Sequence, residues 1–383
     1  MPERIEKTAI SEIETPALLL DPVVMDRNID RMRAAVASLG VAFRPHVKTA
    51  KSLAVVRRMT GGVPGPITVS TLREAEVFAD AGYTDILYAV GVTPNKVARA
   101  QRLRGRGVDL KLIVDNADAA TAIAAAGDPA DPLPVLVEVD SDGHRAGVAP
   151  SDAAALLGIA ARLRGGATLC GLLTHAGASY GATSHAEIRR YADQERDALL
   201  SAAAILREAG HPVETLSVGS TPTALFATDL SGITEVRAGV FVFFDLVMAG
   251  IDVCRVEDIA LSVLASVIAV QPDRGRFLVD AGWSALSRDR GTARQAVDQG
   301  YGLVCDATGR PCPDLIVLEA NQEHGVVGLR PGSTNILPKV AVGDLVRILP
   351  NHACATAGQH AAYRLIDSVR RTVTGSWPRF GGW

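Results

Sequence analysis

The sequence predicts an α/β fold: an eight-stranded parallel (β/α)8 barrel of the TIM type, followed by a C-terminal β-rich domain. From about residue 40 to 240, short apolar runs alternate with amphipathic helical patterns, which is typical of parallel strands with crossover helices. After about residue 255 the segments are strand-like and punctuated by Gly and Pro. A length of 383 residues also exceeds one average domain. We therefore expect a barrel over 22–250 and a β-rich domain from 1–21 and 251–383.

The elements are expected in the following order. A strand at 16–21 precedes a helix at 23–39, and helical patterns such as 72–81, 151–164 and 186–209 separate the barrel strands. A doubly wound open sheet is the alternative. The barrel is favoured because polar residues close the strands at their C-terminal ends, where barrel enzymes build their sites: Lys48, Ser70, Asp140, His175, Ser220 and Arg237. The expected barrel strands are 42–48, 66–71, 85–90, 110–115, 134–140, 168–175, 216–220 and 234–237, and those of the second domain include 259–270, 276–280, 345–349 and 363–367.

Charge and composition exclude several classes of function. The net charge is −3 and no block of Lys and Arg is present, so a nucleic-acid partner is not expected. No run of about 20 apolar residues predicts a membrane span, and residues 1–7 lack the apolar core of a signal peptide. The five cysteines are an odd, widely spread set, which indicates reduced thiols and a cytoplasmic protein.

Lys48 is the candidate nucleophile. A lysine at the end of a strand in a barrel mouth is partly desolvated, and desolvation favours the free amine that forms a Schiff base. The alternative is a surface lysine whose stem packs against the protein, and Lys51 is a nearby competitor.

Two small-residue turns are candidates for binding a phosphate. The run 217–223, Ser-Val-Gly-Ser-Thr-Pro-Thr, and the turn 237–240, Arg-Ala-Gly-Val, each follow an apolar run and offer backbone amides. An ordinary capped strand-to-helix turn explains the first equally well. Arg145, in a polar loop, offers a permanent charge for a phenolate or carboxylate. His175 and Tyr180 follow another strand, although a lone His there is often only a hydrogen-bonded rim residue.

His352 and Cys354 form the candidate metal pair. On an extended segment, side chains at i and i+2 point to the same side, so both could reach one ion. Imidazole and thiolate favour zinc over magnesium, and two protein ligands leave positions open for water or substrate. The alternative is a buried cysteine beside a capping histidine.

Seven motifs occur in order along the chain: Arg-Pro-His-Val-Lys-Thr, Asp-Gly-His-Arg-Ala-Gly-Val, Leu-Leu-Thr-His-Ala-Gly, Ser-Val-Gly-Ser-Thr-Pro-Thr, Glu-Val-Arg-Ala-Gly-Val, Asn-Gln-Glu-His-Gly and Pro-Asn-His-Ala-Cys-Ala-Thr. As a set they resemble the metal-activated, pyridoxal-phosphate-dependent D-serine dehydratase and D-threonine aldolase family, of the alanine racemase fold type (PLP fold type III). The resemblance runs from about residue 15 to 383.

The resemblance implies roles for the candidate residues. Lys48 would bind pyridoxal 5′-phosphate, Arg145 would approach the ring oxygen of the cofactor, and Tyr180 would lie near its ring. His352 and Cys354 would hold the metal, zinc or another divalent ion such as Mn²⁺. The remaining cofactor-binding residues would be His175, Gly219, Ser220, Thr221, Arg237, Gly239 and Val240, the phosphate being surrounded by Gly219, Ser220, Thr221, Gly239 and Val240.

The expected activity is that of a lyase, a dehydratase acting on a D-3-hydroxy amino acid such as D-threo-3-hydroxyaspartate or D-serine. Its products would be a 2-oxo acid and ammonia. Cys354 favours this branch, because the aldolase branch resembles His-x-Asp where this chain has His-x-Cys. The resemblance also implies a homodimer with shared active sites. Retro-aldol cleavage to glycine and an aldehyde, an amino-acid racemase of the same fold and a non-catalytic cofactor-binding protein are the alternatives. Arg288, Arg290 and Arg294 are candidates for a substrate carboxylate, although a solvated loop explains them as well.

Overall fold

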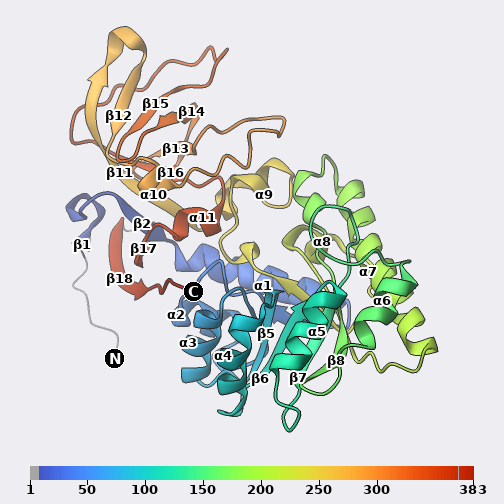
Figure 1. Ribbon diagram of the computed structural model, residues 1–383. Coiled ribbons are helices and arrows are strands. Elements are labelled where there is room, and N and C mark those ends of the chain that lie inside the picture. Colours follow the sequence, from blue (N-terminus) through green and yellow to red (C-terminus); the bar gives the residue numbers. More distant parts are fainter. Residues whose placement is uncertain (1–7, 370) are drawn as a thin grey trace. The chain divides into compact units, whose positions relative to one another are not determined.

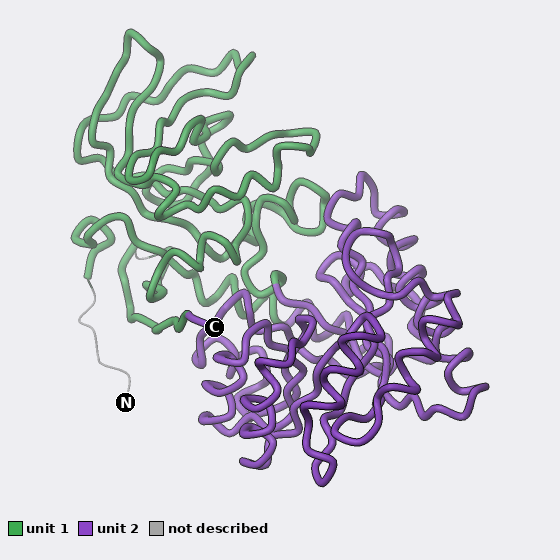
Figure 2. Tube along the Cα trace, in the orientation of Figure 1, with its two compact units in different colours: residues 1–29, 240–381 green, residues 30–239, 382–383 purple. Residues whose placement is uncertain are grey.

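The computed structural model describes residues 8–369 and 371–383. The expectation about a signal peptide falls on residues 1–7 and lies outside this part. The chain divides into two compact units (Figures 1 and 2), one formed by residues 1–29 and 240–381 and the other by residues 30–239 and 382–383. The domain boundaries expected from the sequence, at 21/22 and 250/251, stay a prediction.

The unit formed by residues 30–239 and 382–383 contains an eight-stranded sheet in which all neighbouring strands are parallel. Its strands run in the order β3-β10-β9-β8-β7-β6-β5-β4, so β3 and β4, the two strands of this sheet that come first along the chain, lie at its ends. An isolated parallel bridge between His46 and Thr68 joins these ends and closes the barrel. The strands are β3 (Ala42–Pro45), β4 (Ile67–Val69), β5 (Asp85–Gly91), β6 (Asp109–Val114), β7 (Leu133–Glu138), β8 (Ala167–Leu173), β9 (Thr215–Val218) and β10 (Glu235–Ala238).

Helices connect successive barrel strands, and side-chain caps begin several of them. Thr71, Asn116, Asp152, Ser184 and Ser220 each accept a hydrogen bond from the backbone amide three residues later, which satisfies a donor that the first helical turn leaves free. The helices are α2 (Leu53–Met59), α3 (Leu72–Asp80), α4 (Pro94–Arg104), α5 (Ala117–Ala126), α6 (Ala153–Ala160), α7 (His185–Glu208) and α8 (Thr221–Phe226), while α1 (Pro22–Ser38) precedes β3.

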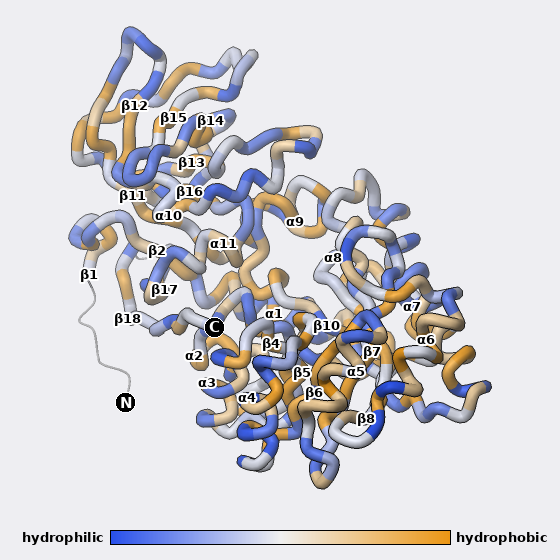
Figure 3. Tube along the Cα trace, viewed as in Figure 1, coloured by the Kyte–Doolittle hydropathy of each residue, from blue (hydrophilic) through white to orange (hydrophobic). Residues whose placement is uncertain are grey.

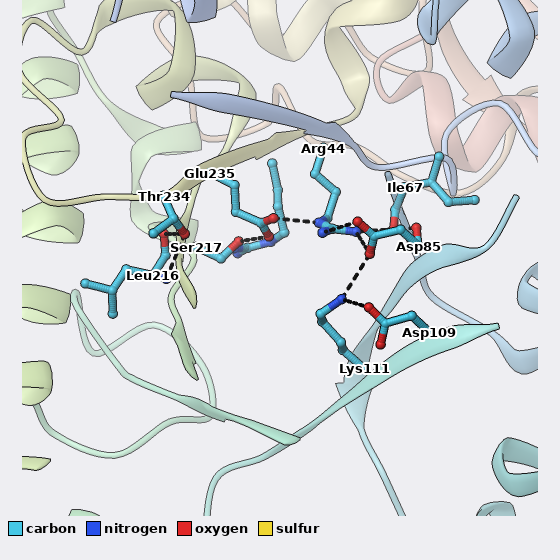
Figure 4. Close-up of polar contacts among 10 residues, drawn as sticks. Arg44, Ile67, Asp85, Asp109, Lys111, Leu216, Ser217, Thr234 and Glu235 are labelled. Carbon is cyan, nitrogen blue, oxygen red and sulfur yellow. Dashed lines mark hydrogen bonds and ion pairs between the residues drawn. The ribbon is translucent and has the colours of Figure 1, made fainter. Parts of the chain in front are cut away.

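Strands of the barrel bury apolar side chains, yet the barrel also carries buried charges. Figure 3 shows hydrophobic colours along β6 and β7, and one buried cluster consists of Leu87, Ile113, Leu136 and Leu173. Arg44 is buried on β3 between Glu235 and Asp85 (Figure 4). Buried charges need partners of opposite sign, and Arg44 has one on each side.

The other unit contains a ten-stranded sheet in the order β1-β18-β17-β2-β11-β12-β15-β14-β13-β16, with a further pairing of β11 and β16. Strand β2, near the start of the chain, is buried between β17 and β11. The strands are β1 (Thr8–Ala9), β2 (Ala17–Leu20), β11 (Leu261–Gln271), β12 (Arg276–Val279), β13 (Leu303–Asp306), β14 (Pro311–Ala320), β15 (Gly325–Leu329), β16 (Leu345–Leu349), β17 (Ala362–Asp367) and β18 (Thr372–Pro378), with short helices α9 (Leu246–Gly250), α10 (Trp283–Leu286) and α11 (Ala353–Ala357).

The predicted fold class is confirmed, since the eight-stranded parallel sheet and a separate β-rich unit are both present. Each expected barrel strand lies within a few residues of an observed one. The main difference is at the first strand, which was expected to reach Lys48 but ends at Pro45. No described helix combines the length and apolar character needed to cross a membrane.

Candidate functional site

Lys48 lies in the turn that follows β3, close to the carboxyl ends of the barrel strands. Its side chain is half-buried, and among the described residues its Nζ has no hydrogen-bond or ion-pair partner. The competitor Lys51 is different, because its Nζ lies 3.2 Å from a carboxylate oxygen of the buried Glu74. An amine held in an ion pair is protonated and is a poor nucleophile. The structure therefore favours Lys48 over Lys51 as the reactive lysine.

Two histidines lie in the same electrostatic neighbourhood as Lys48. Burial, together with the charges of Lys48 and Arg237, holds the pKa of His46 well below its ordinary value. Burial and the charges of Lys48, Arg145 and Arg237 lower the pKa of His175 to about 3. Both imidazoles are therefore neutral near pH 7, and Arg145 and Arg237 supply permanent positive charge at this rim.

The tautomer of His175 follows from its partner. Nδ1 lies 2.9 Å from the carbonyl oxygen of Gly219, which can only accept, so Nδ1 donates its proton. Nε2 is then left as an acceptor. The ring of Tyr180, in the short 3-10 helix η2 (Gly177–Gly181), is tilted against that of His175 with centroids 5.9 Å apart. His175, Tyr180 and Gly219 are thus brought together as the sequence predicted, although their roles stay predictions.

Arg237 is held rigidly on β10. Its Nη1 donates to Ser217 Oγ over 2.6 Å and its Nη2 donates to the Thr174 carbonyl over 2.5 Å. Glu235 accepts a further hydrogen bond from Ser217 Oγ. Burial lowers the pKa of Arg237, but an arginine remains charged under all ordinary conditions. Arg145 differs from Arg237, since it lies exposed in the loop after β7.

The turn after β9 is constrained at every residue. Gly219 has φ +136°, and a Cβ there would lie 2.0 Å from the Arg237 carbonyl oxygen, so only glycine fits. Ser220 caps α8 in a reciprocal capping box with Thr223, and the buried Thr221 follows. The amide of Gly219 donates to Glu195 and that of Ser220 donates to Thr223 Oγ1. Both amides are thus engaged inside the protein, and these two residues would shape a phosphate site rather than donate to it through N–H.

The second candidate turn straddles the boundary of the two units. At Gly239 a Cβ would lie 2.9 Å from the His46 carbonyl oxygen and 3.1 Å from Thr49 Oγ1, so the absence of a side chain permits a close approach to the turn that carries Lys48. Val240 begins the next unit, where it is buried in the 3-10 helix η3 (Val240–Val242).

The candidate metal pair belongs to the β-rich unit. His352 is the N-cap residue of α11, and Cys354 lies in the first turn of that helix. The expectation of an extended segment was therefore wrong, because the chain turns into a helix directly after His352. The two side chains nevertheless meet, since a hydrogen bond joins the imidazole to the Cys354 side chain.

Asp289 orients His352. Its Oδ2 lies 2.6 Å from His352 Nδ1, which leaves Nε2 as the ring nitrogen for a metal. Burial disfavours the imidazolium, but Cys354 and Asp289 outweigh it and raise the pKa of His352 to about 11. The buried Asp245 anchors the backbone beside the pair by accepting the Ala353 amide over 2.9 Å. Within residues 8–369 and 371–383, no group of three or more His, Cys, Asp or Glu side chains is placed to hold a metal ion.

The sequence analysis missed two residues that support the site, Glu195 and Asp289. Glu195 left a signal, because it interrupts the apolar stripe that Ile188, Ala192, Leu199 and other buried residues form along α7. Asp289 left none, since it lies in a loop with charged neighbours. Of those neighbours, Arg288 lies exposed over the Trp283 ring and Arg290 pairs with Asp298.

Comparisons with known proteins bear on the whole chain. Residues 20–247 match the family model "Alanine racemase, N-terminal domain", and residues 260–366 match "Putative serine dehydratase domain". D-threo-3-hydroxyaspartate dehydratase of Delftia sp. (strain HT23) is 50% identical over 375 residues, which cover 97% of this chain and 98% of the relative. The chain belongs to the D-serine dehydratase and D-threonine aldolase family.

A more distant relative and two solved structures are also similar to this chain over nearly its full length. D-serine dehydratase of Dictyostelium discoideum is 29% identical over 391 residues, covering 96% of this chain and 97% of the relative. The solved structure of the Delftia dehydratase is 49% identical, with a TM-score of 0.93 over 98% of this chain and all of that one. A cysteine-to-alanine variant of that enzyme, solved in the metal-free form, has a TM-score of 0.92 over the same shares of the two chains.

Proposed function

We propose that this chain is a pyridoxal-phosphate- and metal-dependent dehydratase that converts a D-3-hydroxy amino acid, such as D-threo-3-hydroxyaspartate or D-serine, to a 2-oxo acid and ammonia. The observation that carries the proposal is 50% identity to D-threo-3-hydroxyaspartate dehydratase over nearly the full length of both chains. The geometry of the two candidate sites supports it independently.

The barrel rim fits pyridoxal 5′-phosphate in its amine and its positive charge. Lys48 offers an amine that has no hydrogen-bond or ion-pair partner in the described part of the chain, and Arg145 and Arg237 supply lasting positive charge beside neutral histidines. The cofactor, when bound, supplies an electron sink for a carbanion. Lys48 would hold the cofactor through Nζ and take the α proton of the substrate once that amine is released. Arg237, fixed by Ser217 and Thr174, would keep its place during this transfer.

The second site fits a soft divalent metal. His352 Nε2 and Cys354 Sγ would hold the ion, and this donor pair favours zinc, with Mn²⁺ or another divalent ion as alternatives. A metal supplies Lewis acidity that stabilises a departing hydroxyl oxygen. Asp289 would keep the imidazole turned toward the ion through Nδ1. That a related dehydratase has a metal-free cysteine variant supports a role for Cys354.

The activity test separates the candidate reactions. The protein is incubated with D-threo-3-hydroxyaspartate, D-serine or D-threonine, with and without a chelator, and ammonia, 2-oxo acid and glycine are measured. Ammonia and 2-oxo acid that disappear with the chelator are expected, and Cys354→Ala should lose both while Cys312→Ala keeps them. Glycine without ammonia would instead indicate the aldolase, and chelator-resistant racemisation would indicate a racemase.

Three further properties complete the proposal. The resemblance supports a homodimer with shared active sites, and the composition supports a cytoplasmic location with no nucleic-acid or membrane partner. Arg288, whose guanidinium lies exposed over the Trp283 ring, is the candidate to bind a substrate side-chain carboxylate.

A further inference from the structure

Glu195 is a buried carboxyl group in a helix where the sequence pattern calls for an apolar residue. It lies near the middle of α7, the helix that connects β8 to β9, and is 1% exposed. Burying an ionisable group costs free energy unless hydrogen bonds compensate for the lost water. The compensation that Glu195 receives comes from the two loops on either side of that helix.

A single oxygen of Glu195 joins these two loops. Its Oε1 accepts the backbone amide of Ala176, in the loop after β8, over 2.7 Å. The same oxygen accepts the amide of Gly219, in the turn after β9, over 3.2 Å. The carboxyl group is also hydrogen-bonded to the side chain of Thr223 at the start of α8.

Two further hydrogen bonds join the loop after β8 to the turn after β9. His175 Nδ1 donates to the Gly219 carbonyl, and the hydroxyls of Ser179 and Ser220 lie 3.0 Å apart. Both backbone groups of Gly219 are therefore fixed, its N–H by Glu195 and its C=O by His175. The loop after β8 therefore sets the position of the turn 219–221, and the Glu195 carboxyl group is hydrogen-bonded to both of these segments.

We propose that Glu195 is a positioning residue of the cofactor site, whose carboxyl group locks the loops after β8 and β9 together and thereby holds the turn 219–221 in the shape that receives the cofactor phosphate. This rests on the proposed function, because it takes the cofactor to be pyridoxal phosphate. It assigns a role to a residue that does not itself touch the cofactor.

The protonation of Glu195 should make the affinity for phosphate depend on pH. Burial raises the pKa of Glu195 to about 7, opposed by the Thr223 hydroxyl, the amides of Ala176 and Gly219 and the charge of Arg237. His175, in the loop packed against it, is neutral at this pH. Glu195 therefore loses its proton as the pH rises through neutrality. The resulting carboxylate repels a phosphate dianion, so phosphate affinity should decline above that pH.

The test compares the binding of pyridoxal phosphate with that of pyridoxal, which lacks the phosphate. Dissociation constants of both are measured on the full chain by the absorbance of the lysine adduct, at pH 6 and pH 8. The ratio of the dissociation constant of pyridoxal to that of pyridoxal phosphate measures the preference for pyridoxal phosphate, and it isolates the contribution of the phosphate. Glu195→Ala should lower the preference for pyridoxal phosphate roughly tenfold or more, because it leaves two buried amides unpaired. Glu187→Gln, which changes a partly exposed carboxylate in the first turn of the same helix, should leave the ratio unchanged.

Glu195→Gln provides the second arm, in case the alanine variant does not fold. Its amide oxygen can still accept both N–H groups, so at pH 6 the ratio should match that of the unmodified protein. From pH 6 to 8 the ratio should fall more in the unmodified protein than in Glu195→Gln. A folded Glu195→Ala with an unchanged ratio, or equal pH dependence in both proteins, overturns the positioning role alone. If the unmodified protein forms no adduct with either compound, the proposed function fails as well.

Discussion

Arg44 lies beside the seam at which the barrel closes, and replacing it tests how much buried charge contributes to the stability of the fold. The ends of the parallel sheet, β3 and β4, are joined by the isolated bridge between His46 and Thr68. Arg44 on β3 adds a side-chain connection across this seam. Its Nε donates to Glu235 on β10 over 2.8 Å, and Nη1 and Nη2 donate to Asp85 on β5 over 2.8 and 3.0 Å (Figure 4).

The magnitude follows from the burial of these groups. The side chains of Arg44 and Glu235 are 6% and 9% exposed. Arg44→Met keeps most of the stem but leaves the Glu235 carboxylate buried without the cation that is hydrogen-bonded to it. Breaking a buried pair in this way costs roughly 3 to 5 kcal/mol. For a unit of about 210 residues, that lowers the melting temperature by roughly 6 to 20 °C.

Calorimetry at pH 7 measures this loss, and two variants control it. Arg106→Met breaks an ion pair between the Arg106 and Asp80 side chains, which are 47% and 66% exposed. The loss in the free energy of unfolding should be less than about 1 kcal/mol. Adding Glu235→Gln to Arg44→Met removes the orphaned charge and should recover part of the loss. The reasoning is refuted if Arg44→Met shifts the transition no more than Arg106→Met does.

Three further predictions concern the sites. Lys48→Ala should abolish the absorbance of the pyridoxal phosphate adduct, while Lys51→Ala keeps it; an adduct that survives in Lys48→Ala would move the attachment elsewhere. Asp289→Asn should weaken zinc binding roughly 10- to 100-fold in a competition titration, because it removes the carboxylate that orients His352; unchanged affinity would contradict that role. Between pH 5 and 8 the folded chain should lose stability relative to Glu195→Gln, because the pKa of Glu195, raised to about 7, keeps a proton in the folded state that the unfolded chain has released; thermal melts across this range measure the difference, and parallel curves would exclude it.

How far the sequence predicts this molecule depends on the kind of signal each part leaves. The barrel strands were predictable because their apolar runs are short and separated by clear helical patterns. The lysine and the His-x-Cys pair were predictable as candidates because their chemistry is rare. The helical start at Ala353 was not, since a five-residue helix is too short to leave a periodic pattern.

The contacts that support the candidate residues were harder to predict. The Glu195 bonds to Ala176 and Gly219 join residues from three separate segments, and only the polar interruption of the α7 stripe hints at them. The pairing of Asp289 with His352 spans 63 positions and depends on a loop without a regular pattern. Such contacts are set by tertiary packing, which local periodicity does not encode.

The position of β2 in its sheet has a consequence for synthesis on the ribosome. Leu20 pairs with Leu261, so β2 emerges long before its partners β11 and β17 exist. At about 5 to 20 residues per second, the delay is roughly 10 to 50 s. During that time residues 30–239 emerge without interruption and can fold first, whereas the wholly apolar segment Ala17–Leu20 has no partner strand. A nascent chain of this protein therefore carries an apolar strand without its partners throughout barrel synthesis, and such unpaired apolar strands are prone to aggregate until their partners are made.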